Sequence, residues 1–428
     1  MSHGSQNAAW KLVDELLTRL RKCSTPDDYD QVQRAIFQCI LQAEQLLGEA
    51  RRCVKRLRRG EGLPVPMPEI NSTLDPRELH TWEIQEAVFK RICRQFHAVG
   101  DALVWRVTGY DRAYVTVLSQ NDAPGPMAPK DGLGYEIGTS VDIRQARGNL
   151  AVLHDLTNCL RIGDITEFCA DGSRIVHEVK KDPARGATPK QLKRMQAAID
   201  CMNLAGALPG VPDSRLVRGT GTCVAHVAPF AELVARAEEV GLAGGRLPQG
   251  RAVVIADVLA MGPRKLTQDS MRYYWDALRA ETFLDAGIAN AEHHITALSM
   301  TRNDGIFPTV VPIGAFPLTT TQCASIICDY TVFEFVLDPS VLVASLADVG
   351  VTASLCLPAA HNSLDQGVTV LTATRGTRRL DIAASALYEL MFEVIDIVDW
   401  SRAVSEMLDD LTLPLHPVPV FHVNGDWQ

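Results

Sequence analysis

Apolar residues in the first sixty positions recur at alternating steps of four and three, the pattern of a helical seam. The seam consists of Ile36, Ile40, Ala43, Leu47, Ala50, Val54 and Leu57. We expect it to pack against a preceding helix, residues 7–23, as an antiparallel hairpin that turns at residues 24–27. A coiled coil between two copies of the chain is the alternative. The Gly/Pro-rich segment 60–68 predicts a linker, so residues 1–60 form a first unit.

The next segment begins with helical periodicity and then loses it. We expect a helix over residues 76–97, whereas the apolar run 101–118 fits either a helix or a strand. Residues 120–138 contain three prolines and four glycines, which predict an unusually long loop. Such a loop is of the kind that flanks a substrate groove.

Two apolar runs joined by an Asp-Gly turn predict a β-hairpin, over residues 160–168 and 174–180. Side chains alternate along a strand, so Glu178 and Lys180 share one face. A two-residue loop would place Asp164 on the opposite face. A three-residue loop with Gly172 in the left-handed conformation would pair Asp164 with Glu178. We predict the three-residue loop.

That register would bring two acids and a lysine together on one face of the hairpin. Asp164 and Glu178 would lie a few ångströms apart, and their repulsion is relieved when a cation lies between them. Hard oxygen ligands with open positions favour Mg²⁺ or Mn²⁺. The ammonium of Lys180 would orient a water nucleophile and stabilise charge on a phosphoryl oxygen. The plainer interpretation is a surface hairpin with a cross-strand ion pair.

The order of these residues resembles the core of the PD-(D/E)XK nuclease superfamily, which has the restriction-endonuclease-like fold. Gly163-Asp164-Ile165 matches the acid of the first strand, Glu178-Val179-Lys180 the (D/E)-x-K of the second, and residues 188–202 the helix that follows. The resemblance covers residues 150–205, and 80–215 more loosely. It implies a nuclease domain over residues 75–215 in a mixed α+β protein.

The resemblance also implies roles for individual residues. Asp164 and Glu178 would bind Mg²⁺ or Mn²⁺, Lys180 would be the catalytic lysine, and Gln191 would belong to the catalytic set. Contacts to nucleic acid would come from the basic residues Lys181, Lys190, Lys193 and Arg194. The expected activity is hydrolysis of DNA phosphodiester bonds, in a prokaryotic defence system or with an activating partner subunit. The alternatives are a non-catalytic nucleic-acid-binding or assembly subunit of nuclease-derived fold, and a structural ion-pair cluster.

Many members of the superfamily supply one more acid from an upstream helix. Glu83, Glu86 and Asp155 are the candidates, and the sequence leaves the choice open. His154 and His177 lie nearby, but they lack the spacing of a histidine pair on one helical face. We expect both to be structural, with His177 pointing away from the acids.

Residues 222–428 alternate short apolar runs with helix-like stretches, which predicts a carboxy-terminal α/β or α+β domain. The runs are 223–227, 252–258, 325–337 and 368–372, and the helix-like stretches are 229–240 and 382–398. Residues 219–223 lack the spacing of a phosphate-binding loop and predict a turn that enters a strand. We expect packing or surface roles for the polar candidates His226, Glu292, His293, His294, Asp329 and His361.

Composition limits the remaining possibilities. The chain has 428 residues, of which 46% are hydrophobic, enough to build two or three domains. Eleven cysteines without CxxC pairs, and the lack of a signal-like or membrane-length apolar run, predict a cytoplasmic location and no membrane role. The net charge of −9 argues against a protein that only coats nucleic acid. However, six Lys and Arg residues lie within 51–59, either to meet phosphate or as the solvated end of a helix.

Overall fold

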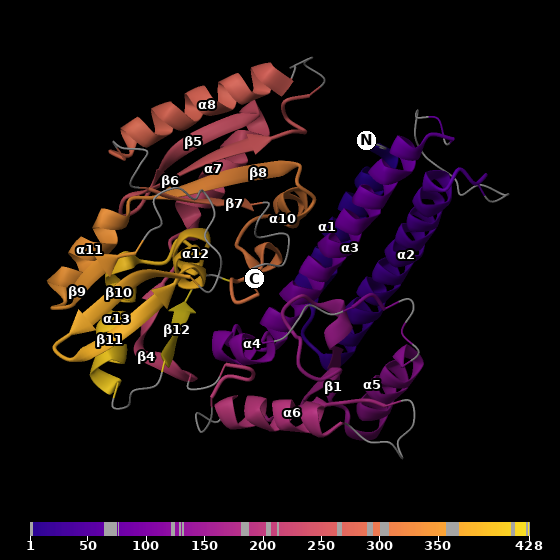
Figure 1. Cartoon of the computed structure of the whole chain (residues 1–428), viewed down its shortest axis with the longest axis horizontal. Coiled ribbons are helices and arrows are strands. Elements are labelled where there is room, and N and C mark those ends of the chain that lie inside the picture. Colours follow the sequence, from indigo (N-terminus) through magenta and orange to yellow (C-terminus); the bar gives the residue numbers. More distant parts are fainter. Residues whose placement is uncertain are drawn as a thin grey trace.

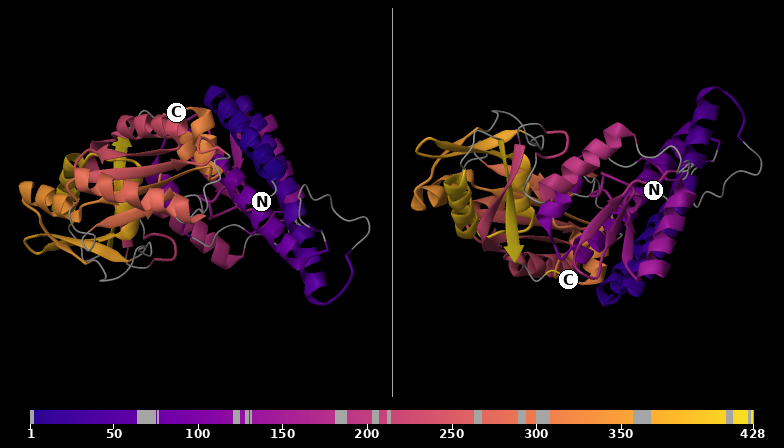
Figure 2. Two further views of the ribbon diagram at one scale, coloured as in Figure 1. Left: turned by 90° about the horizontal axis from the view of Figure 1, so that it is seen from above. Right: turned by 90° about the horizontal axis from the view of Figure 1, so that it is seen from below.

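The computed structural model has the mixed α+β fold that the sequence predicts (Figure 1). The described residues are 3–63, 75, 77–120, 125–127, 130, 132–180, 188–202, 207–211, 214–262, 268–288, 294–299, 308–356, 368–411, 416–424 and 427. The amino-terminal helices lie at one end of the molecule and the carboxy-terminal sheets at the other (Figure 2). No helix in these ranges is both long enough and apolar enough to span a bilayer.

Three long helices form the amino-terminal end: α1 (His3–Lys22), α2 (Pro26–Arg58) and α3 (Leu79–Val107). The predicted turn is confirmed, since Thr25 and Asp28 form a capping box that starts α2. The predicted seam is buried except for the half-buried Leu57. Its main partner is α3 rather than α1, so the predicted pairing was wrong. α1 packs on α3 and also on α10 (Thr320–Ile327), far along the chain.

Two helices follow α3 where the sequence was ambiguous or indicated a loop. The run 101–118 is helical except for residues 108–111, where Gly109 and Tyr110 have φ angles of +64° and +61°. Asp111 caps the short helix α4 (Arg112–Leu118) after that turn. The long loop predicted through residue 138 was wrong, because α5 (Leu133–Arg147) begins inside it and contains two of its glycines. Helix propensity is a weak prior that packing overrides.

A small antiparallel sheet has the order β1-β2-β3 and carries the predicted hairpin. Its strands are β1 (Leu150–Leu153), β2 (Ile165–Phe168) and β3 (Arg174–His177). Gly172 has φ +83°, and the Cys169 N–H donates to the Ser173 carbonyl at 2.9 Å. These two residues enclose a three-residue loop, as predicted. The strands are shorter than predicted, and α6 (Pro189–Met202) follows them.

The carboxy-terminal half contains a four-stranded antiparallel sheet between two helices. The strands are β5 (Leu242–Leu247), β6 (Arg251–Asp257), β8 (Thr331–Leu337) and β7 (Ile295–Leu298), in that order across the sheet. Adjacent glycines of β5 face opposite helices. A Cβ on Gly244 would meet Thr282 of α8 (Gln268–Asp285), and one on Gly245 would meet Leu233 of α7 (Val227–Val240). The absence of side chains there lets both helices approach the sheet.

Two further sheets complete this half. One pairs β4 (Ser214–Val224) in parallel with β12 (His416–Asn424), and the other has the order β11-β10-β9. The latter consists of β9 (Thr352–Leu355), β10 (Thr369–Arg375) and β11 (Arg378–Ala383). Residues 219–223 lie inside β4, so the predicted turn there was wrong. The predicted helix 382–398 is two helices, α12 (Ala384–Phe392) and α13 (Ile397–Asp410), because Val394 has φ +50°. Helix α11 (Pro339–Asp348) packs on β9 and α13.

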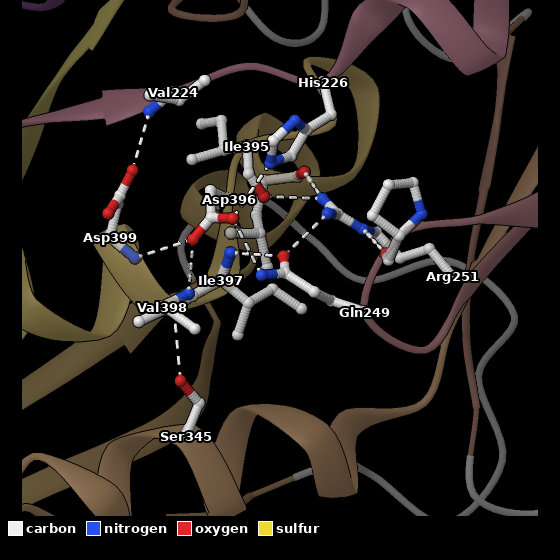
Figure 3. Close-up of polar contacts among 12 residues, drawn as sticks. Val224, His226, Gln249, Arg251, Ser345, Ile395, Asp396, Ile397, Val398 and Asp399 are labelled. Atoms are coloured by element: carbon white, nitrogen blue, oxygen red, sulfur yellow. Dashed lines mark hydrogen bonds and ion pairs between the residues drawn. The ribbon is translucent and has the colours of Figure 1, made fainter.

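Asp396 connects this α12–α13 junction to the rest of the carboxy-terminal half (Figure 3). Its Oδ1 accepts the N–H groups of Val398 and Asp399 and so caps α13. Its Oδ2 lies 2.9 Å from both His226 Nε2 and Gln249 Nε2. Burial opposes ionisation of Asp396, but these donors hold its pKa below the usual value. His226 therefore has the packing role expected of it.

The other polar candidates of this half have structural partners where the structure describes them. Asp329 forms an ion pair with Arg91 at 3.3 Å, and the His294 ring lies 5.4 Å from that of Phe283, centroid to centroid. Glu292, His293 and His361 lie outside the described residues.

A buried ion cluster joins α4 to α12. The Arg112 guanidinium lies 2.6 Å from Glu393 and 3.2 Å from Glu389, and also donates to the Thr309 carbonyl. The side chain of Glu393 is fully buried, and Glu389 and Arg112 are nearly so. Burial raises the pKa of Glu389 to about 7, although Arg112 opposes the shift. Helix α4 is thus fixed to the carboxy-terminal half by charges that have no access to water.

Replacing Arg112 by leucine should destabilise the protein strongly. The Glu393 carboxylate would lose both guanidinium hydrogen bonds while remaining buried, which costs about 3–5 kcal/mol. The matched control is Arg58→Gln, which removes an exposed pair with Glu83 and should cost less than about 1 kcal/mol. Urea unfolding measures both values. Equal losses in the two variants would contradict a structural role for the buried cluster.

Glu389 should make stability depend on pH. Its pKa rises from 4.5 when unfolded to about 7 when folded, so the folded chain binds the proton more tightly. This contribution is complete below the unfolded pKa and is lost as the pH rises through about 7, a change on the order of 3 kcal/mol. Glu389→Gln removes the titration. The unfolding free energy of the parent should therefore fall relative to that of the variant between about pH 5 and pH 8; a constant difference would refute the assignment.

Candidate active site

The open end of the β2–β3 hairpin brings the two predicted acids together. Asp164 stands directly before β2, and Glu178 directly after β3. Ile165 pairs with His177, so both acids leave the hairpin at the same end. The Asp164 N–H donates to the His177 carbonyl at 2.8 Å, and the Asp164 carboxylate accepts the Val179 N–H at 2.7 Å. These bonds hold Asp164 against the chain segment that carries Glu178.

Lys180 and Gln191 both hydrogen-bond the same oxygen of Glu178, Oε1. Gln191 lies in the first turn of α6, and its amide oxygen accepts the N–H and the hydroxyl of Thr188 at 3.0 and 2.9 Å. One amide therefore links the start of α6 to the acid. All four residues that the sequence proposes as catalytic, Asp164, Glu178, Lys180 and Gln191, belong to one connected cluster.

Two further residues complete the cluster, and sequence reasoning missed both. The Lys130 Nζ lies 2.7 Å from Glu136 Oε1, 2.8 Å from Asp155 Oδ2 and 3.6 Å from Asp164 Oδ1. Glu136 is in the first turn of α5. Sequence reasoning missed Glu136 because it predicted a loop over residues 120–138. A helix that starts at Leu133 is what places the Glu136 side chain beside the hairpin.

The upstream acids proposed from the sequence have different positions. Glu83 and Glu86 lie near the start of α3, where they form ion pairs with Arg58 at 2.8 Å and Arg51 at 3.1 Å. These pairs also show that the basic stretch 51–59 is partly neutralised by α3. Asp155 does belong to the cluster, through Lys130. Among the described acids of the cluster, Glu136 is the one that lies on a helix upstream of the hairpin.

Burial and mutual repulsion raise the pKa of two acids. Desolvation is the largest cause for both Glu136 and Glu178, and the charge of Asp164 raises each further. Lys130 and Lys180 oppose these shifts. Desolvation by itself would lower the pKa of Lys130, but Asp155 and Glu136 together raise it well above the usual value. The site thus gathers more negative charge than its two lysines neutralise.

The cluster has the kind of oxygen donors that bind a divalent cation, but Lys130 stands among them. Within the described ranges, no group of three or more His, Cys, Asp and Glu side chains is arranged to hold an ion, and the Lys130 ammonium stands between three of the acids. However, Glu136 Oε2 is buried without a hydrogen-bond partner. Four carboxylates against two ammonium groups also leave two negative charges. Oxygen donors of this kind suit Mg²⁺ or Mn²⁺.

The two nearby histidines have structural partners, as expected. His154 is buried, with Nδ1 3.0 Å from the Gly163 carbonyl and Nε2 2.7 Å from the Thr166 hydroxyl. Burial lowers its pKa to about 3, so the ring is neutral. His177 Nε2 lies 2.9 Å from Glu167, whose carboxylate also binds Arg147 and Asn149.

The basic residues proposed to contact nucleic acid lie on or near α6. Lys190 and Lys193 are exposed, and Arg194 is half-buried. Lys181 lies outside the described residues. Arg194 follows Gln191 by three positions, so both lie on the same side of the helix. The exposed lysines thus lie on the helix whose first turn contacts Glu178.

No protein-family model matches this chain, and neither does any curated protein or solved structure. The site is therefore interpreted from its own geometry.

Gly163 has the backbone geometry that the site requires. Its φ is +82°, and a Cβ there would collide with Val176 and come within 3.1 Å of the His177 carbonyl. Gly172 has almost the same φ, +83°, but nothing lies within 4 Å of its Cβ position. Substitution of Gly172 would therefore introduce backbone strain alone, whereas substitution of Gly163 would introduce the same strain and a steric clash.

Gly172→Ala should cost about 1 kcal/mol from the left-handed conformation alone. Gly163→Ala should cost clearly more, about 3 kcal/mol, because overpacking at the hairpin adds to the same strain. Urea unfolding gives both values. Similar costs would mean that the hairpin relaxes around the new methyl group.

Proposed function

We propose that this chain is a metal-dependent nuclease of the PD-(D/E)XK type, in which β1–β3 with α5 and α6 form a restriction-endonuclease-like core. One observation supports the proposal: Glu136, Asp164, Glu178 and Lys180 belong to one cluster formed by a helix and a hairpin, although 44 positions separate the first from the last. In that cluster Lys130 contacts Glu136 and Asp164, and Lys180 contacts Glu178. A surface ion pair would need only two of them. The partial burial of all four argues further against that simpler role.

Each residue has a chemical role in this proposal. Glu136, Asp164 and Glu178 would hold Mg²⁺ or Mn²⁺. When bound, the ion supplies Lewis-acid activation of a phosphodiester. Lys180 presents an ammonium group that orients water and stabilises negative charge on a phosphoryl oxygen. Gln191 fixes the orientation of Glu178, since it donates to the same carboxylate oxygen as Lys180.

The proposed substrate is DNA, and α6 would bind its phosphate backbone. Lys190 and Lys193 are exposed on this helix, and its first turn contacts Glu178 through Gln191. Phosphate contacts position a nucleic acid without selecting a sequence. Binding through these lysines should therefore weaken as the salt concentration rises.

Conservative variants of the site should abolish cleavage. We expect the parent to cut plasmid or single-stranded DNA in Mg²⁺ or Mn²⁺ but not in EDTA. Asp164→Asn, Glu178→Gln, Lys180→Met and Glu136→Gln should each lower the rate at least about a hundred-fold, because each removes a charge that the reaction needs.

The matched control is Glu83→Gln, an acid of similar size that is paired with Arg58 far from the cluster. It should cut at the parental rate. No cleavage by the parent in either metal would contradict the proposed activity, and retained DNA binding would then favour a non-catalytic nucleic-acid-binding subunit. Equal loss in Glu83→Gln would contradict the site assignment instead.

A further inference from the structure

The Lys130 main chain hydrogen-bonds described residues on both sides of it. Its N–H donates to the Met127 carbonyl at 2.9 Å, and its carbonyl accepts the Leu133 N–H at 3.2 Å. Met127 in turn donates its N–H to Glu44 of α2 at 3.0 Å. These bonds anchor the Lys130 main chain, and the flexible part of the residue is its four-carbon side chain.

The ammonium stands between two of the acids assigned to a divalent ion. It lies 2.7 Å from Glu136 and 3.6 Å from Asp164, which are two of the three acids assigned to the ion. An ammonium and a metal ion cannot both occupy the space between these carboxylates. Its positive charge also opposes the approach of a second cation.

Asp155 offers Lys130 another position. It lies 2.8 Å from the ammonium and comes from the short 3₁₀ turn after β1 (His154–Leu156). An ammonium that gave up Glu136 and Asp164 could keep this partner. The charges then balance, because four carboxylates face two lysines and one divalent ion.

We propose that Lys130 is an internal cation that competes with the divalent ion for Glu136 and Asp164, and withdraws to Asp155 when the ion binds. Lys130 therefore limits metal affinity and keeps the acids neutralised in the metal-free protein. The inference rests on the proposed function only through the shared acids, because it concerns metal binding rather than cleavage.

The test is Mn²⁺ affinity of the full chain, measured by titration calorimetry without nucleic acid. Lys130→Met should bind Mn²⁺ at least about ten-fold more tightly than the parent, since a unit charge about 4 Å away is removed together with the competing group. Lys130→Arg keeps the charge and the bulk and should not bind more tightly. Lys11→Met, an exposed lysine of α1, controls for the change in net charge.

Lys180→Met separates competition from simple repulsion. Lys180 contacts only one of the acids assigned to the ion, Glu178, and lies outside the space between the other two, whereas Lys130 contacts both Glu136 and Asp164. Under competition, its loss should change Mn²⁺ affinity far less than the loss of Lys130. Equal tightening in both variants, or weaker binding by Lys130→Met, would overturn the proposal.

Asp155 provides an independent test. With Lys130 present, Asp155→Asn removes the alternative partner and should weaken Mn²⁺ binding at least about five-fold; with methionine at position 130 it should have little effect. Equal weakening of Mn²⁺ binding with lysine and with methionine at position 130 would identify Asp155 as a metal ligand and contradict the proposal. Unchanged affinity in the single variant would also do so, and this measurement remains informative if Lys130→Met does not fold.

Failure of the proposed nuclease activity looks different. If the parent cuts no nucleic acid but Lys130→Met binds Mn²⁺ more tightly, the results support the competition and contradict the nuclease activity. If the parent cuts DNA but substitutions of Lys130 and Asp155 leave its Mn²⁺ affinity unchanged, the results support the nuclease activity and contradict the competition.

Discussion

The register of the β2–β3 hairpin is the constraint on which the candidate site depends. A shift of one residue would turn every side chain of one strand to the other face, and would separate Asp164 from Glu178. A three-residue loop sets that register, with Gly172 at φ +83° closing it. At the other end, Gly163 leaves no room for a side chain, so Asp164 can lie against the segment after β3. Both glycines thus act on the site without any chemistry of their own.

Charge is the second constraint, and it explains why the site needs partners from several elements. Four carboxylates gathered in a partly buried space would repel one another strongly unless cations stood among them. Lys130 and Lys180 neutralise half of that charge, and the remainder raises the pKa of Glu136 and Glu178 after the effect of burial. A buried cluster with unneutralised negative charge is poorly suited to a purely structural role, because apolar side chains would fill the same space with a smaller desolvation free energy.

Much of the site that is local in sequence was predictable. The hairpin, its loop and the following helix lie within about forty residues, so alternation and turn chemistry suffice to place Asp164, Glu178 and Lys180 together. Gln191 was added only through the family resemblance. Glu136 and Lys130 were not predictable, because glycines and prolines around them favoured a loop and only tertiary packing makes α5 a helix. For the same reason the seam of α2 was found but its partner was not, since periodicity identifies a buried face and not what covers it.

The carboxy-terminal half is coupled to the hairpin through α4. Arg112 of this helix binds Glu393 and Glu389 in the core, and the next residue but one, Tyr114, donates its hydroxyl to Thr166 of β2 at 2.9 Å. Asp111, which caps the same helix, forms an ion pair with Arg174 of β3 at 2.8 Å. Helix α4 therefore contacts both the buried acids of the carboxy-terminal half and the two strands that flank Asp164 and Glu178, and most of these contacts are buried.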